Sequence, residues 1–216
     1  MGALANFSKD WDAKPKEGLR EKIGKILGKD PPLRYKIALA NYKLKTIVNR
    51  LDFLMNKMKE RDKVLFEKVV EALMVKDEAR AAIYASEVAE VRKLVKYLLV
   101  TQVALEQVML RLETIEELGE VAVAMAPLVS VLRQLRGMVK GVIPEVGFEL
   151  AELEEMMNSM IIEMGSFADR SIAVSITSSE AKKILEEATA VAEQRMKESF
   201  PELPTRLGEK VGIELK

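Results

Sequence analysis

The sequence contains neither cysteine nor histidine. Without cysteine the chain can form no disulfide and no thiolate metal site. Without histidine it lacks the commonest metal ligand and the commonest general base. Chemistry is left to carboxylates, lysines, tyrosines and hydroxyls, so we expect a protein that is not an enzyme and that needs no metal ion or cofactor.

Aromatic residues are scarce, and no apolar run is long enough to cross a bilayer. Phe, Trp and Tyr make up 5% of the chain, and the abundant residues are mainly helix formers. The longest largely apolar run, Val121–Leu132, has 12 residues and contains Pro127, whereas a membrane-spanning helix needs about 20 residues. Lys9 and Asp10 interrupt the N-terminal segment, so no secretory signal is predicted. We expect an all-helical cytoplasmic protein that meets membranes only at their surface.

The net charge is zero, but the charge is distributed unevenly along the chain. Residues 1–68 carry 17 Lys and Arg against 9 Asp and Glu, whereas residues 141–216 carry 8 against 15. A basic first part and an acidic last part can attract each other or can face different partners.

Two long segments carry apolar residues at steps that alternate between four and three. In the first segment these are Leu33, Ile37, Ala40, Leu44, Ile47, Leu51, Leu54 and Met58. In the second they are Val91, Leu94, Leu98, Leu105, Val108, Leu112 and Ile115, with the polar Thr101 at one position of the series. This spacing is typical of helices that pack lengthwise. It predicts helices over about 31–73 and 78–118 that form a long antiparallel hairpin. The residues expected in its core are Leu44, Ile47, Leu51, Leu54, Leu94, Leu98, Leu105 and Leu112.

Three shorter helices are expected after the hairpin. The first covers 121–142, and the second follows the apolar positions Val146, Leu150, Leu153, Met157, Met160, Met164 and Phe167. Residues 168–177 are expected to form an extended connector, because Ile172, Val174 and Ile176 alternate with other residues. Thr177 and Glu180 then predict a capping box that opens the last helix. The expected organisation is a basic arm (1–29), a helical core (30–167), an acidic regulatory region made of a linker and the fifth helix (168–199), and a mobile tail (200–216).

This arrangement resembles the ESCRT-III fold over about residues 30–200. Residues 77–93 read Asp-Glu-Ala-Arg-Ala-Ala-Ile-Tyr-Ala-Ser-Glu-Val-Ala-Glu-Val-Arg-Lys. They are similar to the start of the second helix of ESCRT-III subunits, where an Ala-Arg-x-x-Ala-x-x-Ala run leads into a basic turn. The chain is most similar to the archaeal cell-division branch, the CdvB family, and resembles a short paralogue with no room for a winged-helix segment after the fifth helix.

The resemblance implies a function as well as a fold. Family members open into long arms, assemble side by side into filaments, bind anionic membranes and form a ring that constricts at division. They are disassembled by an AAA-type ATPase through its MIT domain. The partners expected from the resemblance are therefore copies of the chain, related ESCRT-III-like subunits, anionic lipids and that ATPase. Nucleic acid is not expected, and the expected location is the inner face of the cell membrane at the division site.

Four basic residues, Lys36, Lys43, Arg50 and Lys57, are spaced by seven along the first long segment. This spacing places them on one flank of the predicted helix. The second helix offers few acids along its flanks, so most of this cationic line is expected to lack a partner within the hairpin. The alternatives are contact with anionic lipid or a neighbouring subunit, a solvated face, and nucleic-acid binding, which the scarcity of stacking aromatics disfavours.

An acidic group and a methionine group lie close together in the fourth predicted helix. The acids Glu152, Glu154, Glu155 and Glu163 are expected to form a solvated face that can fold back on the first helix, because carboxylates without histidine make a poor bundle metal site. The methionines Met156, Met157, Met160 and Met164 are either ordinary core residues or a surface that packs differently in a polymer.

The two ends of the chain carry further candidate contacts. Leu4, Phe7 and Trp11 recur at helical spacing beside lysines, which suits shallow insertion into lipid headgroups. The alternatives are a disordered terminus or a tryptophan packed on the core. In the tail, Phe200, Pro201, Glu202, Leu203 and Pro204 resemble the proline-type motif by which family members bind the MIT domain; the alternative is an inert tail. For the whole chain, the alternative to a membrane-remodelling polymer is a soluble coiled-coil adaptor or tether.

Overall fold

A computed structural model describes residues 31–118, 121–163 and 170–203, and it places side chains at 31–115, 124–163 and 179–203. Within those ranges the regular structure consists of α-helices. They are α3 Leu33–Met74, α4 Glu78–Leu118, α5 Val121–Val139, α6 Pro144–Glu163 and α7 Arg170–Ser199. The prediction of an all-helical fold is confirmed, and the bounds of α3 and α4 lie within two residues of those predicted.

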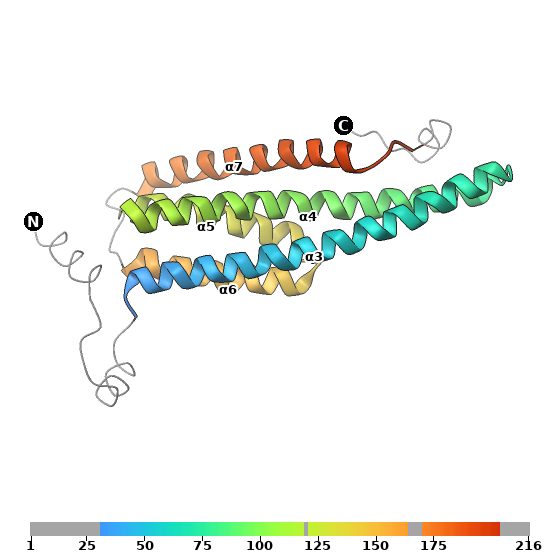
Figure 1. Ribbon diagram of the computed structural model, residues 1–216. Coiled ribbons are helices and arrows are strands. Elements are labelled where there is room, and N and C mark those ends of the chain that lie inside the picture. The colour runs from blue at the N-terminus through green and yellow to red at the C-terminus, as the bar shows by residue number, and fades with distance from the viewer. Residues whose placement is uncertain (1–30, 119–120, 164–169, 204–216) are drawn as a thin grey trace, which may run out of the picture.

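The helices α3 and α4 lie side by side and antiparallel, forming the long hairpin seen in Figure 1. The alternating apolar positions of both helices face each other, as the sequence pattern requires. The hairpin residues that are buried include Leu44, Ile47, Leu51, Leu98, Leu105 and Leu112, whereas Leu54 and Leu94 are partly buried at the edge of the same core. The long seam thus becomes the central contact of the fold.

The turn between α3 and α4 is a short helix-ending motif. Lys76 adopts a positive φ of 58°, and its N–H donates to the carbonyl of Leu73 while the Asp77 N–H donates to the carbonyl of Ala72. These two bonds satisfy the last carbonyls of α3. A carboxylate oxygen of Asp77 then accepts the Arg80 N–H at 3.1 Å, which caps the start of α4.

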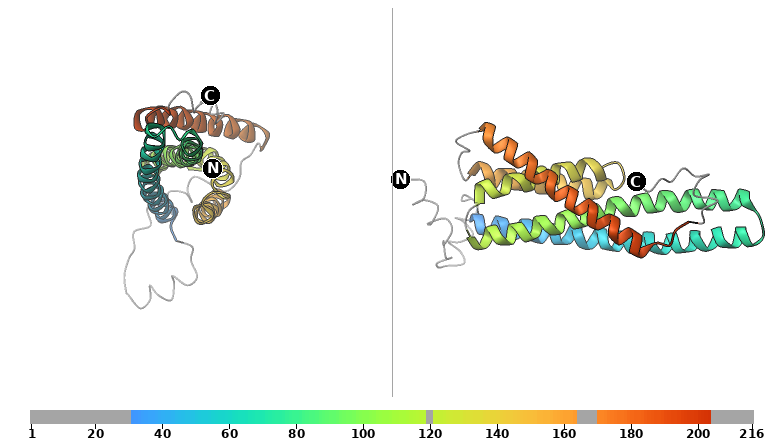
Figure 2. Two further views of the ribbon diagram at one scale, coloured as in Figure 1. Left: turned by 90° about the vertical axis from the view of Figure 1, so that its right-hand side faces the viewer. Right: turned by 90° about the horizontal axis from the view of Figure 1, so that it is seen from above.

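The helices α5 and α6 return along one half of the hairpin and complete a four-helix bundle. They pair with each other, α5 lies against α4, and α6 lies against α3, as the end-on view in Figure 2 shows. With 19 and 20 residues they reach about 30 Å, whereas the 42 residues of α3 reach about 63 Å. The hairpin therefore projects well beyond the bundle.

The helix α7 crosses the outside of the bundle over α4 and α5 (Figure 2). In the part of α7 whose side chains are described, the buried residues are small except for one isoleucine: Ala181, Ile184, Ala188 and Ala192. The end of α7 and the segment that follows it reach the projecting part of the hairpin. There Leu203 packs on a second apolar cluster, the tip cluster, formed by Val69, Ala72, Ala81, Ala85 and Val88.

The prediction of an extended connector over 168–177 is wrong from Arg170 onward, because α7 already begins there. The capping-box prediction at Thr177 and Glu180 fails for the same reason, since both residues lie inside a continuous helix. Three alternating apolar residues are weak evidence for an extended segment beside a helix that forms downstream. Extending a helix costs much less free energy than starting one.

Candidate functional site

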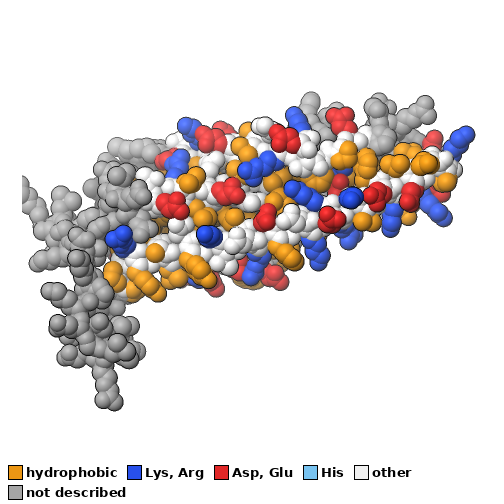
Figure 3. Space-filling model, viewed as in Figure 1, with side chains coloured by type: hydrophobic (Ala, Val, Ile, Leu, Met, Phe, Trp, Pro, Cys, Tyr) orange, Lys and Arg blue, Asp and Glu red, His pale blue; other side chains and the backbone are white. Residues whose placement is uncertain are grey.

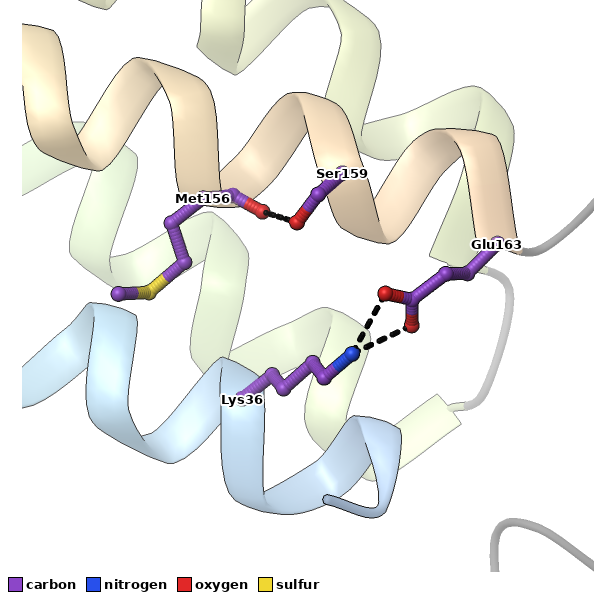
Figure 4. A network of polar contacts seen from close by, with 4 residues as sticks. All are labelled: Lys36, Met156, Ser159 and Glu163. Atoms are coloured by element: carbon purple, nitrogen blue, oxygen red, sulfur yellow. Dashed lines mark hydrogen bonds and ion pairs between the residues drawn. The ribbon is translucent and has the colours of Figure 1, made fainter. Parts of the chain in front are cut away.

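The cationic line lies on the side of α3 that faces α6. Lys36 donates to both carboxylate oxygens of Glu163, at 2.5 and 2.6 Å, as Figure 4 shows. Lys43 donates to Glu152 at 3.1 Å. These cations are therefore neutralised by α6 and not by the second helix of the hairpin.

A third pair continues the same row, and the fourth cation is free. Arg50 Nη1 lies 3.0 Å from Glu149 Oε1, while Lys57 is exposed and makes no ion pair within the described part of the chain. The pairs run in opposite directions along α3 and α6, and each row spans 14 residue steps, or about 21 Å. We call Glu149, Glu152 and Glu163 the acidic cover.

The acidic cover is held weakly by charge. The side chains of Lys43 and Glu152 are 37% and 67% exposed, and exposed ion pairs contribute at most about 1 kcal/mol each. Only Lys36, at 12% exposed, is largely withdrawn from solvent. Apolar side chains of α6 supply the stronger contact, because Leu150 and Leu153 are fully buried in the bundle core.

Two other expectations for α6 have mixed outcomes. Glu154 was expected on a solvated face, but it is buried and accepts a hydrogen bond from Arg133 Nε at 2.8 Å. Glu155 is exposed as expected. Met157 and Met160 are fully buried core residues, and Met156 packs partly against the same core; Met164 lies outside the described side chains.

An exposed aromatic stripe on α3 was missed by the sequence reasoning. Its aromatic members Tyr35, Tyr42 and Phe53 are 59%, 70% and 69% exposed, and the aliphatic Val64, which is 50% exposed, continues the stripe. Their spacings of 7, 11 and 11 residues keep them within about 40° of arc on the helix surface. Hydrophobic side chains are visible over α3 and α6 along the lower edge of the molecule in Figure 3. The signal was present in the sequence as apolar residues that recur outside the heptad seam.

The helix α7 is held to the bundle by two ion pairs beside its small apolar face. Arg111 pairs with Glu180, and Lys96 Nζ donates to Glu193 at 2.9 Å. The hydrogen bond and the positive charge of Lys96 hold the pKa of Glu193 below its usual value of 4.5. Both cations come from α4, so α7 is anchored mainly to the second helix of the hairpin.

The proposed ATPase-binding segment is described as far as Leu203, and it lies against the hairpin. The Pro201 carbonyl accepts a hydrogen bond from Arg92 on α4 at 2.7 Å. The Phe200 ring lies beside the same guanidinium, and Leu203 reaches the tip cluster. Pro204 lies outside the described residues, as do Leu4, Phe7 and Trp11 of the predicted membrane-inserting arm.

Within the described residues, no group of three or more carboxylates is placed to hold a metal ion. None of the described helices is both long enough and apolar enough to cross a bilayer. The surfaces that this part of the chain offers for contacts are the cationic line, the aromatic stripe, and the docked end of α7.

Two proteins of Sulfolobus acidocaldarius are similar to the chain. Cell division protein B1 is 48% identical over 198 residues, which cover 92% of the chain and 89% of that protein. Cell division protein B is 38% identical over 162 residues, which cover 75% of the chain and 62% of that protein. No protein-family model matches the chain, and no solved structure matches it significantly. The similarity to the first protein extends over nearly all of both chains.

Proposed function

The chain belongs to the CdvB family of archaeal, ESCRT-III-like cell-division proteins. From that premise we propose that it is a polymer-forming subunit that binds anionic membranes and drives their constriction and scission during division. It would act from the cytoplasm, on the inner face of the membrane at the division site. The observation that carries the proposal is the joint presence of a cationic line and an exposed aromatic stripe on α3.

The outer surface of α3 has the chemistry that a lipid interface requires. Aromatic side chains such as Tyr42 and Phe53 favour the headgroup region, and lysines beside them attract anionic headgroups. A helix with both features lies along a membrane surface and does not cross it. The exposed Lys57 extends the positive surface one step of seven residues beyond the acidic cover.

The acidic cover makes this surface switchable. Each cation gains about 1 kcal/mol from an anionic membrane, which is close to what it gains from an exposed carboxylate. For the charges alone, exchanging Glu149, Glu152 and Glu163 for lipid phosphates is therefore nearly balanced. Separating the two helices also exposes Leu150 and Leu153, a cost that new apolar contacts in the assembled polymer must offset. We propose that the described arrangement is a closed form and that α6 leaves α3 when the chain assembles on a membrane.

Exposed apolar side chains on the hairpin support lateral assembly. Ile83 and Leu110 on α4 are both 63% exposed, and Phe53 on α3 is 69% exposed. Burying such side chains against a neighbouring subunit contributes about 25 cal/mol for each Å² removed from water. The proposed partners are further copies of this chain, related ESCRT-III-like subunits, and an AAA-type ATPase whose MIT domain takes the segment that begins at Phe200.

Vesicle sedimentation tests the membrane part of the proposal. The variant replaces Lys36, Lys43 and Arg50 by Gln. Glutamine removes the charge without placing a new carboxylate opposite the acidic cover. We expect the variant to bind vesicles containing anionic lipid at least tenfold more weakly than the unmodified chain, with unchanged binding to neutral vesicles.

A matched control separates the face of α3 from net charge. Replacing Lys182, Lys183 and Arg195 by Gln removes the same number of charges from exposed positions on α7. This control should retain most of the binding. Equal binding of anionic vesicles by the α3 variant and the unmodified chain would refute the proposal that this face of α3 contacts the membrane. A small oligomer of fixed size that does not bind lipid would favour the alternative of a soluble adaptor.

A further inference from the structure

Arg92 joins three parts of the chain that are far apart in sequence. Its Nε and Nη2 donate to the two carboxylate oxygens of Asp62 on α3, at 2.7 and 3.1 Å. Its Nη1 donates to the Pro201 carbonyl beyond α7, at 2.7 Å. The side chains of Arg92 and Asp62 are only 15% and 4% exposed, so this polar centre is largely shielded from water.

The same guanidinium lies over two aromatic rings. Its central carbon is 5.7 Å from the ring centre of Phe66 on α3 and 5.3 Å from that of Phe200. A guanidinium over an aromatic face is attracted to it, most strongly when both are desolvated. Phe66 and Arg92 thus form a ready surface for one further ring, which Phe200 supplies.

The contacts select a particular peptide. A planar guanidinium can fork to a carboxylate, donate a further hydrogen bond and stack on rings at the same time, whereas a lysine ammonium cannot. The peptide contributes an aromatic ring, a proline carbonyl and, two residues later, a leucine that packs on the tip cluster. Proline has no N–H to leave unpaired and fixes its own φ, so ordering this peptide costs less conformational entropy.

We propose that the hairpin carries a binding site for a Phe-Pro-x-Leu peptide, with Arg92 as its specificity-determining residue, and that the chain's own residues 200–203 fill it here. The consequence for partners rests on the proposed function. If the ATPase recognises the same segment, the hairpin and the ATPase cannot bind it at the same time, because Phe200 and Leu203 are already in contact with the hairpin. Docking of the tail would then withhold the chain from disassembly.

The first test uses the absence of cysteine from the chain. A Leu203→Cys variant places one thiol at the tip cluster, and its labelling rate with a maleimide reports how often the segment leaves the hairpin. Adding Arg92→Lys, which leaves a cation beside Asp62, should raise the rate at least tenfold. Adding Arg61→Lys, at an exposed position on α3, should leave it unchanged. Equal rates in all three backgrounds would overturn the proposal.

The second test supplies the peptide from outside and does not depend on the Arg92 variant folding normally. A fluorescent peptide of residues 198–205 is titrated into full-length chains and followed by anisotropy. A Phe200→Ala chain, whose own segment binds poorly, should take up the peptide at least tenfold more tightly than the unmodified chain. The same peptide carrying Phe200→Ala should not bind. Binding that is equal for both peptides, or absent from both chains, would contradict the site.

A third measurement keeps this proposal separate from the ATPase proposal. Titrating an MIT domain of the disassembly ATPase into the Arg92→Lys chain should show tighter binding than to the unmodified chain, because the segment itself is intact but released. If no chain binds the MIT domain while the labelling and peptide results hold, the ATPase proposal fails and the hairpin site stands.

Discussion

Removing the acidic cover should increase membrane binding. The perturbation is the replacement of Glu149, Glu152 and Glu163 by Gln, which keeps the side-chain shape and removes the three carboxylates that face the cationic line. The freed cations remain on α3, beside the exposed aromatic stripe. The prediction is thus a gain of function, and pelleting without vesicles is subtracted so that aggregation is not counted as binding.

The size of the gain follows from the number of cations released. Each cation near an anionic surface gains about 1 kcal/mol, so three gain about 3 kcal/mol, or about a hundredfold in affinity at 1.4 kcal/mol for each factor of ten. Lys43 and Arg50 are already 37% and 40% exposed and reach lipid in part without the change. We therefore expect an increase between about tenfold and a hundredfold. Salt should reduce it, because mobile ions screen exposed charges.

The assay is sedimentation with vesicles that contain anionic lipid, over a range of lipid concentrations. The matched control replaces Glu186, Glu187 and Glu198 by Gln, which changes the net charge by the same amount on exposed positions of α7. The control should gain little. An equal gain in both triple variants would show that net charge alone drives binding, and no gain in the α6 variant would refute the idea that the cover restrains α3.

Three further predictions concern stability. Lys76→Gly should raise the free energy of unfolding, measured in urea titrations, by about 0.5–1 kcal/mol. Glycine relieves the strain of the left-handed backbone at the hairpin turn, and this gain exceeds the entropy that glycine adds to the unfolded chain. An unchanged free energy of unfolding would mean that the turn is unstrained. Asp62→Ala should lower the same quantity by about 3 kcal/mol, because it leaves a shielded guanidinium without its carboxylate, whereas Asp52→Ala at an exposed position should change it little. The pKa of Glu193 is lowered in the folded chain, so its pair with Lys96 stabilises the fold above pH 4.5 and loses that contribution as the pH falls further. Glu193→Gln should remove this part of the acid sensitivity, and acid melting curves that coincide for both proteins would contradict it.

The sequence was sufficient to predict the hairpin because one signal persists over its whole length. From Leu33 to Met58 the apolar residues follow the alternating spacing of four and three without interruption. A stripe of that length is most simply buried against a second long helix with the same spacing. The start of α7 was mispredicted because Ile172, Val174 and Ile176 form a pattern too short to separate strand from helix. The preference of such β-branched residues for strands is small and is easily outweighed when they continue an existing helix.

The site was only partly predictable, for a different reason. The cations of α3 could be aligned from their spacing, and Glu152 and Glu163 were expected on a face that can fold back on the first helix, as they do. Which acid meets which cation could not be assigned from the spacing, and Glu149 was not expected among the partners. The partners lie on α6, which reaches α3 only because α5 reverses the chain in between. The clamp formed by Arg92, Asp62 and Pro201 joins residues up to 139 positions apart, and no local pattern encodes such a contact.

The alanine-rich contact of α7 bears on what happens when that helix detaches. An alanine methyl group removes far less apolar area from water than a leucine side chain does. The buried positions in the described part of α7 are Ala181, Ile184, Ala188 and Ala192, so this contact removes less apolar area from water than one built from four leucines would. A helix held by so small an apolar area can separate from the bundle and return to it at a lower free-energy cost than a leucine-rich helix of the same length.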